Sequence, residues 1–218
     1  MRIELDPLEA RVIGCLIEKQ ITTPDQYPLS LNALVNACNQ KSNRDPVMSL
    51  DEATVQHVLD ALSRKHLVLE RSGFGSRVPK YQHLFCNTEY GSLKFSPQEL
   101  AIVCELLLRG PQTAGELRSR AARMASFASA ADVETALQNL LDREGAPLVT
   151  RLAREPGRRE LRFMHLFSGE LPPQDIANDA ATESDVQPVQ PDALAARVAR
   201  LEEEVRLLRA ELDALRDR

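Results

Sequence analysis

"KYQHLF", residues 80–85, and "LRFMHLF", residues 161–167, end on the same three residues, His-Leu-Phe. In both stretches a basic residue and an aromatic residue precede this ending. A match of three letters arises easily by chance, so it is informative only if the segments before it also correspond. The two parts of the chain do correspond, in the order and in the kind of their segments, and this predicts an internal repeat.

Both parts begin with the signals of a helix N-terminus. "DPLE", residues 6–9, and "SPQE", residues 96–99, each offer an N-cap residue, a proline at the first helical position and a glutamate three residues after the cap. Such a capping box stabilises a helix start by about 1 kcal/mol. The apolar positions that follow match at an offset of 90 residues and predict two amphipathic helices: Val12, Ile13, Leu16 and Ile17 against Ile102, Val103, Leu106 and Leu107.

A second helix is predicted in each part. In the first part it is "SLNALVNACNQ", for which Ser30 is the expected N-cap. In the second part it is "TAGELRSRAARM", where Thr113 and Glu116 form an expected capping box. These starts again favour the same local structure in both parts.

Third helices are predicted in "SLDEATVQHVLDALSRKH" and "SAADVETALQNLLDRE". The first of them is expected to start with a capping box of Ser49 and Glu52. Their apolar residues recur at helical spacing and are expected to face inward: Val55, Val58, Leu59, Leu62, Val133, Leu137, Leu140 and Leu141.

A β-hairpin is predicted after each third helix. Turn residues in "SGFGSRVPK" and "REPGRRE" separate two strand-forming runs, and the second run ends on His-Leu-Phe. Helix, helix, helix and hairpin is the element order of a winged helix. The fold expected is therefore mainly α with small β-hairpins, as two tandem winged-helix domains, residues 1–95 and 96–169. Leu84, Phe85, Leu166 and Phe167 are expected to pack on the helices, with His83 and His165 at the strand edges and no metal bound.

Long runs of the chain resemble the YceH family of bacterial proteins. These runs are "EKQITTPDQYPLSLNALVNACNQKSNRDPVM", "SGFGSRVPKY", "LLLRGPQTAGELRSRAARM" and "VTRLAREPGRRELRFMHLFSGE". The similarity covers residues 1–170. The resemblance implies a pair of winged-helix domains in a bacterial cytosolic protein, and it supplies no catalytic residues.

Composition limits the other possibilities. The start "MRIELDPLEARVIGCLIEKQ" is interrupted by acids and lacks the length of a membrane span, so no signal peptide or transmembrane segment is expected and the cytoplasm is the predicted location. The four cysteines contain no CxxC pair and are expected to be buried thiols. The acid excess lies in residues 170–218, which carry 12 Asp and Glu against 6 Lys and Arg. The overall net charge of −5 therefore does not exclude nucleic acid as a partner of the body.

The C-terminal part of the sequence predicts a linker and a coiled-coil helix. Residues 170–192 are rich in proline, acids and small polar residues, a composition typical of disorder. Residues 193–218 follow a heptad with leucine at every d position, which favours a two-stranded parallel coiled coil. The seam predicted to form a homodimer is Leu194, Val198, Leu201, Val205, Leu208, Leu212 and Leu215.

Charges beside this seam also favour the parallel orientation. In a parallel dimer the facing pairs have opposite charges, whereas a symmetric antiparallel dimer opposes like charges. Two alternatives stay open, a lone amphipathic helix docked on its own body and a higher oligomer. The facing parallel pairs are Arg197 with Glu202, Glu204 with Arg209, and Glu211 with Arg216 of the second chain.

Double-stranded DNA is the first candidate partner, although the third helices argue against deep reading of the major groove. Their first turns carry Asp51, Glu52, Asp132 and Glu134, and carboxylates repel phosphate. Positive charge gathers instead in the second part, where all the basic residues are arginines, suited to bidentate phosphate contacts. A plain solvated hairpin is the alternative for this cluster. The candidates are Arg118, Arg120, Arg123, Arg154, Arg158, Arg159 and Arg162.

The first part offers a different candidate surface. A row of amides near helical spacing is followed by two cations, and such a row either binds a partner or braces its own loops. The candidates are Asn36, Asn39, Gln40, Lys41, Asn43 and Arg44.

The rival hypothesis is a protein-interaction adaptor that uses the winged helices as assembly surfaces. The balanced charge of the body favours it. No enzyme is expected, because "SGFGSR" leads into a strand where a phosphate loop needs a helix, and no catalytic set or ligand spacing stands out. Neither a cofactor nor a metal is expected.

Overall fold

The computed structural model describes residues 3–71, 78–154 and 160–169. They all belong to one compact unit, Met1–Ala177. The predicted linker and coiled coil lie outside the described residues. Among the helices of the described part, none combines the length and the apolar character needed to cross a membrane.

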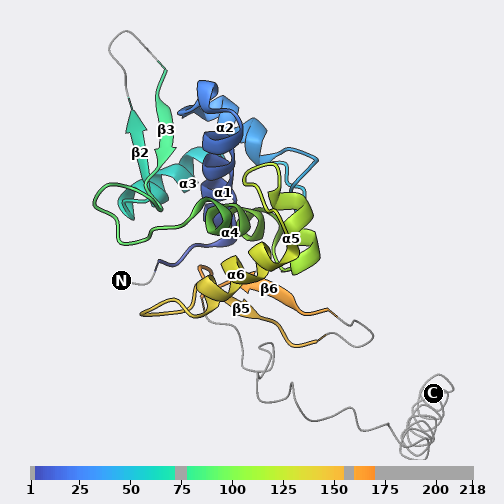
Figure 1. The fold of residues 1–218 in the computed structure, drawn as a ribbon. Helices are drawn as coiled ribbons and strands as arrows, with labels where there is room; N and C mark the ends of the chain where they lie inside the picture. Colours follow the sequence, from blue (N-terminus) through green and yellow to red (C-terminus); the bar gives the residue numbers. More distant parts are fainter. Residues whose placement is uncertain (1–2, 72–77, 155–159, 170–218) are drawn as a thin grey trace, which may run out of the picture. The chain divides into compact units, whose positions relative to one another are not determined.

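Apart from the 3-10 turn η1, the described residues form the same series of elements twice (Figure 1). The first series is α1 (Pro7–Thr22), the 3-10 turn η1 (Pro24–Gln26), β1 (Leu29–Ser30), α2 (Leu31–Cys38), α3 (Glu52–Arg64), β2 (Val68–Arg71) and β3 (Lys80–His83). The second series is α4 (Pro97–Arg109), β4 (Gln112–Thr113), α5 (Ala114–Ala121), α6 (Ala130–Leu141), β5 (Val149–Arg151) and β6 (Arg162–His165). The internal repeat and the mainly helical fold are thus confirmed.

Each half contains a small three-stranded antiparallel sheet. The strand orders are β1-β3-β2 and β4-β6-β5, so that the second strand of each hairpin lies in the middle of its sheet. The sequence predicted the two hairpins but not β1 and β4. These strands have only two residues each and run directly into a helix, which is too short for a period-2 pattern to be recognised.

The helix starts follow the predicted caps with one exception. Asp6 and Ser96 each form a complete capping box, and the box at Thr113 is also confirmed. The box of Ser49 and Glu52 was wrong. Asp51 is the cap of α3, because its carboxylate directly precedes the helix and accepts the backbone N–H of Thr54 at 2.8 Å.

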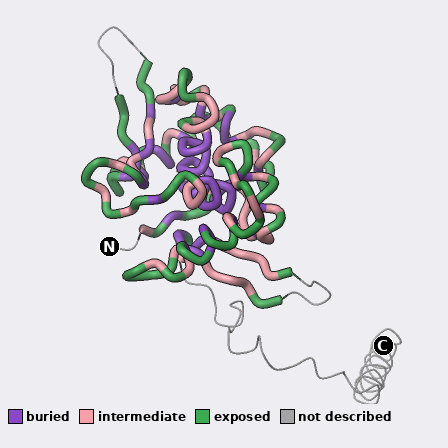
Figure 2. Tube along the Cα trace, viewed as in Figure 1, coloured by how far each residue is buried: buried purple, intermediate pink, exposed green. Residues whose placement is uncertain are grey.

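Within the described residues, the apolar faces of the six α-helices share one core, with α1 and α4 side by side at its centre (Figure 2). All predicted inward positions are buried except Leu141, which is half-buried. The close approach of α1 and α4 depends on Gly14, whose added Cβ would lie 2.8 Å from Leu108 Cδ2. The Cys104 Sγ, at the position equivalent to Gly14 in the second half, contacts the Gly14 carbonyl oxygen at 3.3 Å. All four cysteines are buried and free.

The two His-Leu-Phe endings meet each other. The rings of Phe85 and Phe167 pack edge to face with centroids 5.0 Å apart, and both residues are buried. The backbone N–H of Leu5 in the first half also donates to the Phe167 carbonyl oxygen at 2.6 Å. The repeated phrase therefore closes each hairpin and also joins the two halves. Leu166 is buried as predicted, whereas Leu84 is only half-buried.

From the sequence, the histidines of the repeated phrase were expected at strand edges, and this was wrong. Both histidines lie in the interior. His83 is 7% exposed and His165 is 5% exposed, because the strands that carry them are central in their sheets. The His83 Nε2 lies 2.6 Å from Gln20 Oε1, and the backbone N–H of Phe167 donates to His165 Nδ1 at 3.3 Å. Burial lowers the pKa of both imidazoles to about 4.

These pKa shifts predict that mild acid destabilises the fold through the two histidines. A base whose pKa is lower in the folded protein binds more protons when unfolded, so stability is full above about pH 6.5 and falls as the pH drops towards 4. Between pH 7 and pH 5 we expect a loss of about 1–2 kcal/mol of unfolding free energy for each histidine. Urea denaturation of wild type and of His83→Asn at both pH values tests this. An equal pH dependence in the two proteins would contradict it.

Candidate nucleic-acid and partner interface

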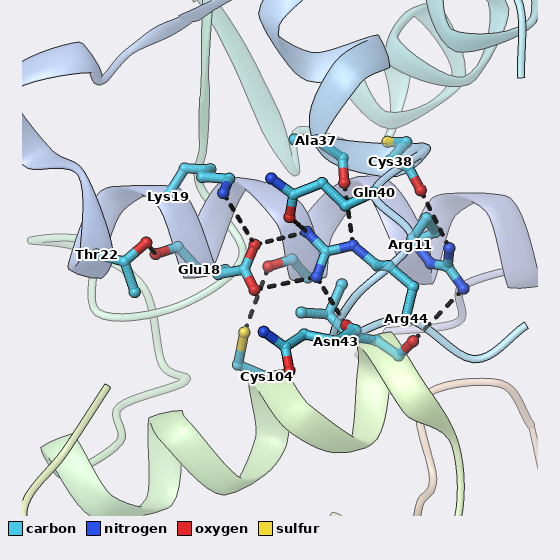
Figure 3. A network of polar contacts seen from close by, with 12 residues as sticks. Arg11, Glu18, Lys19, Thr22, Ala37, Cys38, Gln40, Asn43, Arg44 and Cys104 are labelled. Carbon is cyan, nitrogen blue, oxygen red and sulfur yellow. Dashed lines mark hydrogen bonds and ion pairs between the residues drawn. The ribbon is translucent and has the colours of Figure 1, made fainter. Parts of the chain in front are cut away.

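Arg44, a predicted binding residue, lies inside the protein. It is 4% exposed, and its guanidinium makes a two-pronged ion pair with Glu18, Nη1 to Oε1 at 3.0 Å and Nη2 to Oε2 at 2.6 Å (Figure 3). Its Nε donates to the Ala37 carbonyl oxygen, and Gln40 Oε1 accepts a further hydrogen bond at 3.0 Å. Burial opposes its charge, but the hydrogen bond and charge of Glu18 prevail and raise the pKa of Arg44. Arg44 and Gln40 thus brace the first half.

Arg123 extends this ion pair to the second half. Its Nη1 lies 2.5 Å from Glu18 Oε1 and its Nη2 lies 2.6 Å from Glu105 Oε1. Both glutamates are buried, while the Arg123 side chain keeps 27% of its surface exposed. Although burial opposes ionisation of Glu18, the hydrogen bond and charge of Arg44 and the charge of Arg123 hold its pKa below the ordinary value. The four residues Glu18, Arg44, Glu105 and Arg123 form one network, here called the inter-half ion network.

Arg11, which the sequence reading missed, has a related structural role. Its side chain is 2% exposed and donates to the carbonyl oxygens of Cys38 at 3.2 Å and Pro46 at 2.7 Å. A further hydrogen bond reaches the Leu108 carbonyl oxygen in α4 at 3.4 Å. The only sequence signal is a cation beside the apolar positions of α1. Arg11 therefore satisfies backbone groups of both halves where they meet.

Most of the amide side chains in this row form hydrogen bonds within the protein's own loops. Asn39 exchanges two hydrogen bonds with the backbone of Leu50, and Asn43 has a left-handed φ of 57° while its Oδ1 accepts from Arg109 Nη1. Asn36 donates to the Asn32 side chain on the exposed face of α2. Among the candidates of the first half, Asn36 and Lys41 are therefore the two that remain on the surface without bracing a loop.

The arginine candidates of the second half lie at different depths. Arg118 and Arg154 are exposed. Arg120 pairs with Glu116 and donates to Gln112 Oε1 at 2.7 Å, and Arg162 donates to the Pro111 carbonyl oxygen. Outside the described residues lie Arg158 and Arg159, together with Leu194, Val198, Leu201, Val205, Leu208, Leu212 and Leu215.

The first hairpin carries a pair of cations that the sequence reading did not identify. Arg71 on β2 and Lys80 on β3 are direct partners in the strand register, and both are exposed. Within the part of the chain that the structure describes, neither side chain has an ion pair with a carboxylate. Like charges directly opposite each other destabilise a sheet. The sequence could not predict this pair, because residue spacing does not give the strand register between β2 and β3.

The exposed faces of the third helices are acidic and polar. α3 exposes Glu52, His57 and Asp60, with Arg64 as an exposed cation in its last turn, and α6 exposes Glu134 and Gln138. Asp51 and Asp132 are engaged in capping hydrogen bonds, which lower the pKa of both carboxyls. The positive charge of the described surface therefore belongs to the hairpins more than to these helices.

The described residues thus define a mainly helical protein with two small three-stranded antiparallel sheets, joined through a buried ion network. Residues 5–158 match the family described as "Protein of unknown function, DUF480", and the chain belongs to this family. It is 58% identical over 218 residues to a UPF0502 protein of Aeromonas hydrophila, covering 100% of this chain and 97% of that one. A UPF0502 protein of Cronobacter sakazakii is 58% identical over 215 residues, covering 99% and 97% of the two chains. The coarser expectation, a family of bacterial proteins, is therefore confirmed, and the family shown is UPF0502 and DUF480.

Proposed function

We propose that this chain is a non-enzymatic protein of two tandem winged helices that binds nucleic-acid duplex through its hairpins. In this proposal the β2–β3 and β5–β6 hairpins act as wings that contact phosphates. The third helices do not read bases deeply, since their exposed faces carry carboxylates that phosphates repel. Such binding is electrostatic and shows little sequence preference.

The observation that carries the proposal is the cation pair of Arg71 and Lys80. Two like charges fixed opposite each other have no benefit for the hairpin itself, whereas a phosphate between them would bind both. On the second hairpin, Arg154 adds an exposed cation, and Arg151 and Arg162 stand on its two strands. Cations on both hairpins match what a phosphate backbone attracts.

Charge reversal of the first hairpin tests the proposal. We expect the variant Arg71→Glu/Lys80→Glu to bind random-sequence duplex DNA at least about tenfold more weakly at low salt. The slope of log K against log salt should become less steep by about 2, because two phosphate contacts are lost. Fluorescence anisotropy of a labelled duplex, titrated from low to physiological salt, measures both quantities.

A matched control separates local contacts from net charge. Arg64→Glu/Lys94→Glu reverses one exposed arginine and one exposed lysine that do not belong to either hairpin, so it changes the net charge by the same amount. We expect this control to keep most of the affinity. Equal losses in the two variants would show that only net charge matters and would overturn a role for the hairpin.

A protein-interaction adaptor is the second candidate function. It is favoured because Arg44 and Arg123, two of the predicted binding residues, serve the inter-half ion network. It is also favoured by the uncharged amides and carboxylates on the exposed faces of α3 and α6. No duplex binding even at low salt would select the adaptor, and the exposed faces of α3 and α6 would then be the surfaces to mutate.

We also propose that the protein acts as a parallel homodimer through the heptads of residues 193–218. Two copies would present four hairpins to one repetitive partner, which raises the effective concentration of each. Removal of residues 190–218 is expected to give a folded monomer in sedimentation analysis. A truncated chain that still sediments as a dimer would move the interface to the helical body.

A further inference from the structure

A pocket of about 600 Å³ opens where the two halves meet. Its walls come from the N-terminal segment, from the connector between β3 and α4, from the loop between α6 and β5, and from the segment that follows β6. The lining is mainly apolar and includes Ile3, Leu93, Pro147, Leu148, Leu166 and Phe167. An apolar pocket of this size between the two halves can bind a segment of polypeptide chain.

The described chain ends at this pocket. Gly169 follows Phe167, a lining residue, by two positions, and its φ of +95° is a left-handed conformation that favours glycine. The residues that come next are "ELPPQDI", residues 170–176. From Gly169 to Ile176 an extended chain spans at most about 23 Å, so all seven residues remain within reach of the pocket.

The chemistry of this segment matches the pocket. Leu171, Pro172, Pro173 and Ile176 are apolar, and the carboxylates of Glu170 and Asp175 accompany them. Within residues 170–192 there are six carboxylates and no lysine or arginine. The segment therefore offers apolar side chains to the lining and negative charge to any cation beside it.

One of the lining residues, Arg143, is a cation that can pair with a carboxylate. Arg143 lines the pocket and is held by a hydrogen bond from Nη2 to the Lys94 carbonyl oxygen at 2.8 Å. Its guanidinium carbon also lies 5.2 Å from the centroid of the Phe95 ring. A guanidinium has five N–H donors, so one hydrogen bond does not use up its capacity to donate. Glu144, the other charged lining residue, is exposed to solvent.

We infer that residues 170–176 of the same chain bind in this pocket, with Leu171 and Ile176 as its apolar anchors and Arg143 as the partner of a linker carboxylate. The acidic linker is then anchored at its start, across the seam between the halves, and only the residues after it act as a tether. This inference is independent of the proposed function, since it requires no nucleic acid.

The absence of tryptophan from the chain provides a direct test. Leu171→Trp in the full-length protein introduces a single fluorophore at the proposed anchor, and Ile176→Trp gives a second, independent probe. Val189→Trp, later in the linker, is the matched control. We expect the indoles of the two anchor variants to emit at shorter wavelength than that of the control and to be quenched several-fold less by acrylamide.

A second substitution locates the burial. Ala146 lines the pocket and is exposed, so Ala146→Phe fills the pocket with little effect on the core. Combined with Leu171→Trp, it should restore quenching to the level of the control. The inference is overturned if Leu171→Trp and Ile176→Trp are both quenched as strongly as Val189→Trp, or if Ala146→Phe leaves their protection unchanged. It is also overturned if protection disappears on dilution, because the occupant is then a second copy of the chain.

Discussion

Glu18→Leu is expected to lower the free energy of unfolding by about 3–5 kcal/mol, among the largest effects of any single substitution in this chain. The change keeps the side-chain volume approximately but leaves the guanidinium of Arg44, a residue that is 4% exposed, without its two-pronged partner. Arg123 loses one of its two carboxylates at the same time. Urea denaturation followed by far-UV circular dichroism at pH 7 measures the loss.

Two comparisons make this prediction specific. Glu134→Leu removes an exposed carboxylate from α6 and should change stability by less than about 0.5 kcal/mol. Arg44→Leu should be costly alone, but the double variant Glu18→Leu/Arg44→Leu should lose clearly less than the sum of the two single losses, because it leaves no unpaired charge between them. A loss below about 1 kcal/mol for Glu18→Leu would contradict a buried role for the pair.

Gly14→Val is expected to destabilise the protein by about 1–3 kcal/mol through overpacking between α1 and α4. An added Cβ already lies within 2.9 Å of Leu108 Cγ and within 3.3 Å of Leu107 Cβ, both in α4. The two further methyl carbons of valine force the helices apart and disturb the contact of Cys104 with the Gly14 carbonyl oxygen. Thermal and urea unfolding of the full-length protein test this.

Gly115 is the control for the glycine effect. It lies in the first turn of α5, where an added Cβ would approach only Thr113 Oγ1, at 4.0 Å. Gly115→Ala should therefore be neutral or stabilise the protein by up to about 1 kcal/mol, because alanine loses less backbone entropy in a helix. A Gly14→Val protein as stable as Gly115→Ala would show that α1 and α4 are not closely packed in solution.

The repeat, the helices and most caps could be predicted because their signals are local. A capping box such as Ser96 with Glu99 needs four consecutive residues, and an apolar face repeats every three or four. No local sequence pattern indicates whether a charged residue is buried. Arg44 is buried because Glu18 stands 26 positions earlier in the chain, and Arg123 reaches Glu18 from a different half. The same holds for Arg71 and Lys80, whose pairing depends on a strand register that spacing alone does not give.

The contact between equivalent positions of the two halves has a further consequence. Gly14 meets Cys104, and Phe85 meets Phe167, so at these two places equivalent positions face each other, as they do across the axis of a symmetric dimer. Because one peptide chain joins the two halves, their association does not depend on protein concentration and dilution cannot separate them. The two halves therefore stay associated at any protein concentration, whereas the two subunits of a dimer dissociate on dilution. Its two hairpins remain free to carry different charges, because neither has to match the other.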